Sequence, residues 1–181
     1  MIPDEQTIDA LWEKYRLPPQ KRIHCGVVSQ VALILAQKWK ECDVHIQINE
    51  QLLTAAAFLH DIDKNIEKLP GEHHPDAGVR ILKEEGMSEV AEVIRTHPLH
   101  MIVDESTAPK TIEQKLLFLA DKMTKQKCIG VDKRFAVWRE EDTDEQSKTV
   151  LEKAYPKVKA LRDEVLHCAG ITEDELEKLM R

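Results

Sequence analysis

Apolar residues recur at helical spacing along most of the chain, and no stretch shows the alternation typical of a β-strand. The helix predicted from Pro19 to Lys40 has an apolar face made by Val27, Val28, Val31, Leu35 and Trp39. His24 lies one turn before this set, so we expect its side chain to point toward the core. A helix is predicted from Glu50 to about Asp61, and its interior, residues 52–59, is apolar almost all round, which is typical of a buried central helix. The pattern predicts an all-α protein.

Capping and helix-breaking residues set the limits of the other predicted helices. Asn49 and Ser88 are suitable N-caps, while Thr111 and Thr172 each begin a sequence with the spacing of a capping box. Pro75 suits a first helical turn, and glycines follow several predicted helix ends. The predicted helices cover residues 7–15, 19–40, 50–61, 75–85, 88–97, 111–121 and 144–168, the last with a kink at Pro156, and a short helix follows Thr172.

Length and composition favour one soluble helical domain over residues 1–181. The chain has 181 residues, of which 42% are hydrophobic and 33% are charged, and it contains 6 Gly and 8 Pro. This length can bury one core without disulfides, and the 4 cysteines form no C-x-x-C pair. The longest apolar run, residues 31–36, is too short to span a bilayer, and residues 1–5 do not resemble a leader. We therefore expect a cytoplasmic protein that does not bind membranes.

The net charge of −7 argues against broad nucleic-acid binding, because that mode depends on Lys and Arg neutralising phosphates. Charge is unevenly distributed, since residues 110–134 contain seven Lys or Arg and three acids. A local basic strip could suit a small anion, although a solvated helix face explains the same pattern.

The candidate chemistry centres on His60 and Asp61, which end the apolar segment. An ionised carboxylate in such surroundings costs several kcal/mol unless something compensates it. A divalent cation would do so, and His24 and Asp121 are residue types that bind one from the apolar sides of other helices. Alternatively, Asp61 forms an ion pair with Lys64 while His24 and Asp121 make ordinary hydrogen bonds. Each residue alone favours this alternative, but the order His, His-Asp, Asp favours a metal site.

This order resembles the HD superfamily of metal-dependent phosphohydrolases. In that family an early His, a His-Asp pair and a distant Asp hold a metal ion, and here they correspond to His24, His60, Asp61 and Asp121. The segments FLHDIDK at 58–64 and LADK at 119–122 are similar to the family's motifs. The resemblance implies an HD-domain helical bundle over about residues 20–140, with additional C-terminal helices over about residues 141–181.

Two further segments resemble the subgroup that binds two metal ions. HPDAG at 74–78 and IRTH at 94–97 are similar to its H-P-x-x-G and I-x-x-H motifs. The resemblance implies that Asp61 bridges the ions and that His74 and His97 complete the second site. His73 and His100 are alternative ligands. The ligand types suit Fe or Mn first, with Zn, Ni, Co and Mg as alternatives.

The resemblance also implies a function, namely hydrolysis of a nucleotide or dinucleoside polyphosphate by a metal-activated hydroxide. The ligand order is similar to that of bacterial HD enzymes that cleave diadenosine tetraphosphate symmetrically. The Ile62-Asp63 pair departs from a related branch that has Ile-Gly, and His97 is followed by Pro98 rather than by the second His or the Thr of some relatives. A mononuclear 5′-nucleotidase and a non-catalytic, metal-stapled nucleotide-binding module remain alternatives.

Basic residues close to the proposed ligands are candidate contacts for a substrate phosphate. Lys64 follows the His-Asp pair closely, and we predict that it is catalytic through its positive charge. Arg22, Lys122 and Lys125 are further candidates for substrate binding, since they lie near His24 or Asp121 in the sequence. The oligomeric state cannot be inferred from these patterns.

Overall fold

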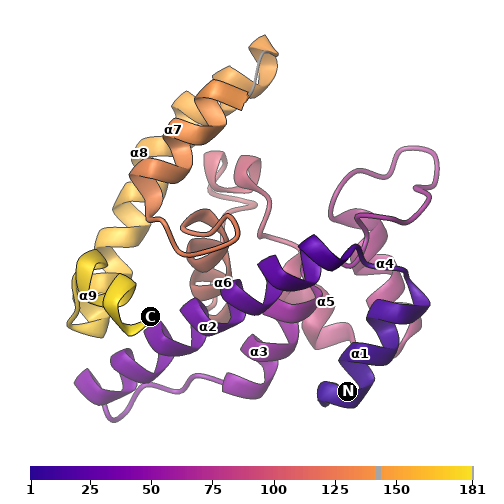
Figure 1. Cartoon of the computed structure of the whole chain (residues 1–181), viewed down its shortest axis with the longest axis horizontal. Helices are drawn as coiled ribbons and strands as arrows, with labels where there is room; N and C mark the ends of the chain where they lie inside the picture. The colour runs from indigo at the N-terminus through magenta and orange to yellow at the C-terminus, as the bar shows by residue number, and fades with distance from the viewer. Residues whose placement is uncertain (142–143, 181) are drawn as a thin grey trace.

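The structure is a computed structural model that describes residues 1–141 and 144–180, and over these residues it contains helices and no β-strand. An isolated bridge joins Thr124 to Cys128. The helices, shown in Figure 1, are α1 (Glu5–Lys14), α2 (Pro19–Cys42), α3 (Glu50–Leu59), α4 (Asp76–Glu84), α5 (Ser88–Ile94), the 3₁₀-helix η1 (Leu99–Val103), α6 (Ile112–Lys122), α7 (Val131–Glu141), α8 (Glu145–Ala169) and α9 (Glu173–Leu179). The predicted all-α class is confirmed.

The long helix α2 organises the bundle, because α3, α6 and α8 all pack against it. The shorter helices α4 and α5 pack together, and α5 also contacts α3. Large side chains such as Leu35, Leu53 and Phe118 are fully buried in one hydrophobic cluster that includes residues from α1 to α9. In Figure 1, α7 and the first part of α8 lie side by side and project from the bundle.

Several predicted helix starts are confirmed by their caps. The Asn49 side chain accepts a hydrogen bond from the Leu52 N–H, and Thr111 and Thr172 each form a complete capping box. The helix α8 continues through Pro156 and ends at Gly170, which has a positive φ of 65°. Glycine adopts this left-handed conformation without a steric penalty.

Two expectations about the helices were wrong, and one helix was missed. Ser88 is the first residue of α5 rather than its cap, and no side chain caps this helix at Met87. The helix α3 ends at Leu59 instead of Asp61, where four-residue turns such as the one closed by the Ile62 N–H to Leu59 C=O bond replace the helical pattern. The helix α7 was not predicted, although Val131, Phe135 and Trp138 have helical spacing. No helix within the described residues is long and apolar enough to cross a membrane.

Candidate metal centre

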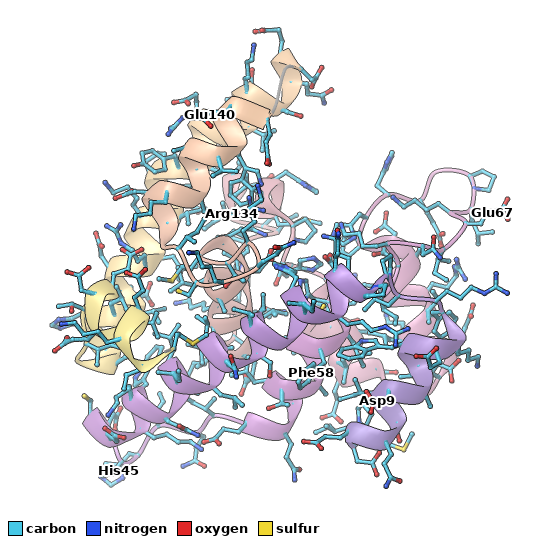
Figure 2. The ribbon with its side chains drawn as sticks, in the orientation of Figure 1. Asp9, His45, Phe58, Glu67, Arg134 and Glu140 are labelled. Atoms are coloured by element: carbon cyan, nitrogen blue, oxygen red, sulfur yellow. The ribbon has the colours of Figure 1, made fainter. Side chains whose placement is uncertain are left out.

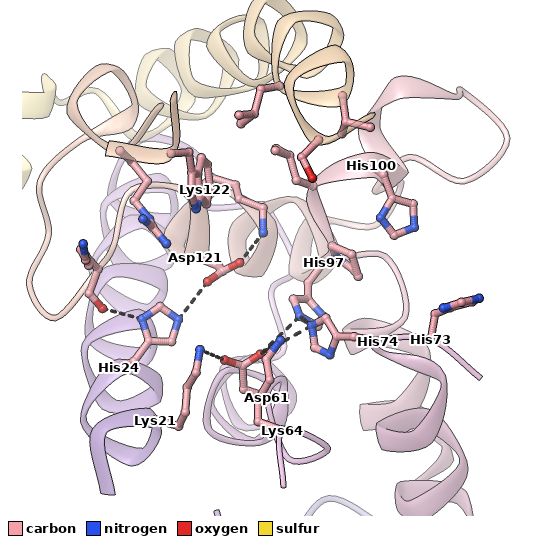
Figure 3. A pocket seen from close by; sticks show the side chains of 18 of the residues that line it. Lys21, His24, Asp61, Lys64, His73, His74, His97, His100, Asp121 and Lys122 are labelled. Carbon is pink, nitrogen blue, oxygen red and sulfur yellow. Dashed lines mark hydrogen bonds and ion pairs between the residues drawn. The ribbon is translucent and has the colours of Figure 1, made fainter. Parts of the chain in front are cut away.

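Six side chains from five segments of the chain converge at one end of the bundle. Figure 3 shows five of them, namely His24, Asp61, His74, His97 and Asp121. His24 comes from the first half of α2, and Asp121 from the last turn of α6. His60 and Asp61 lie where α3 ends, so the change from helix to turn directs the two neighbours to different parts of the site. His74 precedes α4, and His97 follows α5. The structure thus brings together all six residues that were predicted as metal ligands.

His24, His60 and Asp121 form the first group of potential ligands. The Nε2 atom of His24 is 3.0 Å from Oδ1 of Asp121, and Nε2 of His60 is 3.6 Å from the same oxygen. The ligand atoms of these three residues lie within 4.8 Å of one another, so a single ion could contact them all after small side-chain shifts.

Asp61 connects this group to His74 and His97. Its Oδ2 atom is 3.9 Å from Nε2 of His60, while Oδ1 is 3.6 Å from Nε2 of His74 and 3.9 Å from Nε2 of His97. The Nε2 atoms of His74 and His97 are themselves only 2.9 Å apart. The two oxygens of Asp61 therefore face the two histidine groups.

The other nitrogen of each imidazole is held by a hydrogen bond. Nδ1 is 2.6 Å from the Lys125 carbonyl in His24, 2.7 Å from the Ala57 carbonyl in His60 and 2.6 Å from the Ile94 carbonyl in His97. In these three rings Nδ1–H donates to a carbonyl, so Nε2 is the nitrogen that can bind a metal ion when the ring is neutral. Such bonds are typical of metal-binding histidines, because they fix both the tautomer and the direction of the ring.

Asp63 holds the fourth imidazole in the same way. Its buried Oδ1 atom is 2.8 Å from Nδ1 of His74 and can accept that N–H. In the sequence, Asp63 is recognisable only as a departure from the motif of a related branch. Nothing in the sequence indicates that its side chain faces His74. The carboxylate increases the basicity of the ring, which strengthens it as a ligand.

A divalent cation fits this arrangement on the chemistry of the residues present. The Nε2 atom of His60 is buried and has no hydrogen-bond partner among the described residues, although buried polar atoms normally have one. It points into a set of nitrogen and carboxylate ligands of the type that binds first-row transition metals. The geometry favours a metal site over the alternative in which ordinary hydrogen bonds satisfy every member.

The electrostatics of the centre also favour bound positive charge. Burial opposes ionisation of Asp61, but His60 and Lys64 hold the pKa of its carboxyl well below the ordinary value. Burial likewise opposes ionisation of Asp121, yet Lys122 and the histidines hold its pKa low. Burial and the charges of neighbouring groups push the pKa of His97 well below its usual value, which keeps this ring in the neutral form that binds metals.

Lysine ammonium groups contact the same carboxylates. Lys64 lies 3.3 Å from Oδ1 of Asp61, as the ion-pair alternative predicted, and Lys21 lies 2.9 Å from Oδ2. Lys21 was missed, although its position one turn before His24 places both residues on one face of α2. The buried Lys122 contacts Asp121, and Lys125 lies 2.6 Å from Glu141 at the edge of the same cavity.

Arg22 does not reach the site, so its prediction as a substrate contact is wrong. Its guanidinium pairs with Glu13 and donates to the Leu17 and Trp12 carbonyls, on a different face of α2 from His24. Arg22 and His24 are two residues apart, and each residue of an α-helix adds about 100° of rotation. Their side chains therefore leave the helix roughly 200° apart.

His73 and His100 line the cavity but stand outside the ligand group, with exposed rings that point away from Asp61 in Figure 3. The structure therefore favours His74 and His97 over these alternatives. The cavity itself has a volume of about 1340 Å³. Its wall includes Arg134 and Trp138 from α7 and Ser147 from α8, none of which was predicted.

Comparison with known proteins identifies a family over most of the bundle. The protein-family model described as HD domain matches residues 22–125, which is more than half of the chain. No curated protein and no solved structure gives a significant match. The match contains all six converging residues, and α7, α8 and α9 lie beyond it.

Proposed function

Because the chain belongs to the HD domain family, we propose that it is a metal-dependent phosphohydrolase with two divalent ions and a nucleotide or dinucleoside polyphosphate as its substrate. One observation carries this proposal. The Nε2 atoms of the four converging histidines lie close to the carboxylates of Asp61 and Asp121. In each ring, a hydrogen bond at Nδ1 fixes the orientation.

The resemblance to the two-metal subgroup suggests the ligand sets. His24, His60, Asp61 and Asp121 would hold one ion, and Asp61, His74 and His97 would hold the other. The short distances within the group His24, His60 and Asp121, and from Asp61 Oδ1 to the Nε2 atoms of His74 and His97, support this assignment. When bound, the ions would activate water at neutral pH and offset charge on the phosphoryl oxygens. Iron or manganese is our first choice, because the set combines imidazole and carboxylate ligands without a thiolate.

The residues of the chain would bind and orient the phosphate. Lys64 and Lys21 lie on either side of Asp61, so their ammonium groups could contact oxygens of a phosphate placed at the ions. Lys122 is buried beside Asp121 and lies over the Phe118 ring, which suits it to hold that carboxylate in place. Lys125 stands farther out, at the cavity edge, where it could contact a longer substrate.

The reaction adds water across a phosphorus–oxygen bond. The oxygen of the attacking water bonds to phosphorus and gives up a proton to solvent. The leaving oxygen departs with the bonding electrons and takes a proton from solvent. Charge stabilisation and positioning account for most of the catalysis that phosphoryl transfer requires of a protein. The convergence of cationic side chains and metal ligands on one cavity supports this chemistry.

Metal analysis combined with a hydrolysis screen tests the proposal. Anaerobically purified protein should contain two transition-metal ions per chain and hydrolyse members of a panel of nucleotides and dinucleoside polyphosphates. Asp61→Ala should lose metal and activity together, whereas Asp76→Ala, an exposed change near His74, should keep both. One bound ion with activity toward monophosphates would favour a mononuclear 5′-nucleotidase, and bound metal without turnover would favour a binding module.

A further inference from the structure

Arg134 carries a positive charge that forms no ion pair with a described residue, since the carboxylates of Asp121 and Glu141 act on it only from beyond ion-pair distance. Its guanidinium carbon lies 4.1 Å from the centroid of the Trp138 ring, one turn farther along α7. The Nε and Nη1 atoms are buried and have no hydrogen-bond partner among the described residues. No carboxylate within residues 1–141 and 144–180 forms an ion pair with this side chain. The stacking on Trp138 therefore orients the guanidinium but does not satisfy its donors.

Such an arrangement favours an anionic ligand. Arginine stays protonated at neutral pH, so it cannot escape the cost of its unpaired donors by losing a proton. Buried charged donors without acceptors destabilise a protein, and an anion that accepts from them removes that cost. Planar guanidinium groups held on an aromatic ring are well suited to bind phosphate oxygens, because little side-chain freedom is lost on binding.

The position of Arg134 relates this charge to the metal centre. The side chain lines the same cavity as Asp61, Asp121 and three of the four converging histidines, but it comes from α7 rather than from the segments that carry the proposed ligands. Figure 2 shows Arg134 near the base of the projecting α7. The cavity volume of about 1340 Å³ exceeds the roughly 300 to 1000 Å³ typical of small-ligand sites, so it has room for a substrate that reaches beyond the ions.

We infer that Arg134 binds a phosphoryl group of the substrate other than the one placed at the metal ions. The substrate class is then a compound with a chain of phosphoryl groups rather than a simple monoester. This inference rests on the proposed function, since it takes the metal centre as the place of hydrolysis. It assigns to α7, a helix outside the family match, the selection of polyphosphorylated substrates.

A binding titration tests the inference without relying on turnover. Metal-loaded protein is titrated calorimetrically with tripolyphosphate and, separately, with orthophosphate, and metal content is measured before and after. We expect Arg134→Gln to weaken tripolyphosphate binding by about ten- to a hundredfold, the range for a lost hydrogen-bonded charge, while orthophosphate binding stays unchanged. Arg139→Gln is the matched control, because Arg139 also stacks on an aromatic ring but pairs with Glu152 outside the cavity.

The outcomes separate the inference from the proposed function. Equal tripolyphosphate affinity in the wild type and Arg134→Gln overturns the inference, and so does an equal loss for both anions. If Arg134→Gln does not fold, Arg134→Lys decides: a selective loss of tripolyphosphate affinity supports the inference, and unchanged affinity overturns it. Selective, Arg134-dependent binding in a protein that hydrolyses no phosphate compound would leave the inference standing and refute the proposed function.

Discussion

Replacing Asp63 with Asn should weaken one of the two proposed metal sites. Asp63 contacts no proposed ion, but its Oδ1 atom is 2.8 Å from Nδ1 of His74 and is buried with 1% of the residue exposed. The amide keeps the shape of the side chain and can still accept a hydrogen bond. It removes the negative charge that makes the imidazole a stronger ligand.

The expected magnitude follows from the role of this contact. Hydrogen bonds to an ionised acceptor are about twice as strong as neutral ones, and loss of such a partner typically lowers metal affinity by about ten- to a hundredfold. That range equals roughly 1.4 to 2.8 kcal/mol of binding free energy. Only the ion bound by His74 and His97 should be affected, because carbonyl groups orient His24 and His60.

Competition with a chromophoric chelator can resolve the two affinities in anaerobic protein. In Asp63→Asn one affinity should fall and the other should stay at the wild-type value. Asp76→Asn is the control, since Asp76 accepts a hydrogen bond from the His73 backbone N–H and does not contact the His74 ring. Two ions bound with wild-type affinity would refute the reasoning, whereas equal loss of both would show that Asp63 serves the fold instead.

Three other predictions concern the same centre. Lys64→Met should keep both ions and lower kcat by about ten- to a thousandfold, or roughly 1.4 to 4 kcal/mol, and normal turnover with intact metal would remove Lys64 from the mechanism. Removal of the ions by a chelator should lower the Tm, because an ion bound only by the folded state adds stability; an unchanged melting curve after confirmed removal would contradict this. In chelated protein, folding lowers the pKa of the Asp121 carboxyl below its ordinary value of 3.8. The ionised carboxylate therefore stabilises the folded state at a pH above 3.8, and this stabilisation is lost as the pH falls below that value. The difference in unfolding free energy between wild type and Asp121→Asn should therefore shrink as the pH falls below about 4, and a constant difference would contradict this.

Much of the helical framework could be predicted because its signals are local. Asn49, Thr111 and Thr172 each cap a helix through a side chain that bonds to a backbone N–H three residues away. Such contacts are independent of the rest of the fold. The helix α7 was missed although its apolar spacing was present in the sequence. The unpredicted end of α3 at Leu59 shows that turns can replace the last part of an apolar helical run.

The residue types, their order and the resemblance that they carry were sufficient to predict which side chains converge. A His, a His-Asp pair and a later Asp on apolar faces require some compensation for buried charge. The resemblance to the HD superfamily added His74 and His97 as candidates. The separations of these side chains, and the bridging position of Asp61 between two histidine groups, depend on how α2, α3 and α6 pack.

The groups that surround the ligands were decided only by the tertiary structure. Asp63 holds His74 across a loop, Arg22 turns away toward Glu13, and Arg134 reaches the cavity from a helix more than seventy residues after Asp61. A sequence pattern reports which side chains share a face of one helix. It does not indicate which helix faces contact one another, because these contacts depend on the packing of segments that are distant in the chain. The same packing determines which groups surround a charged side chain.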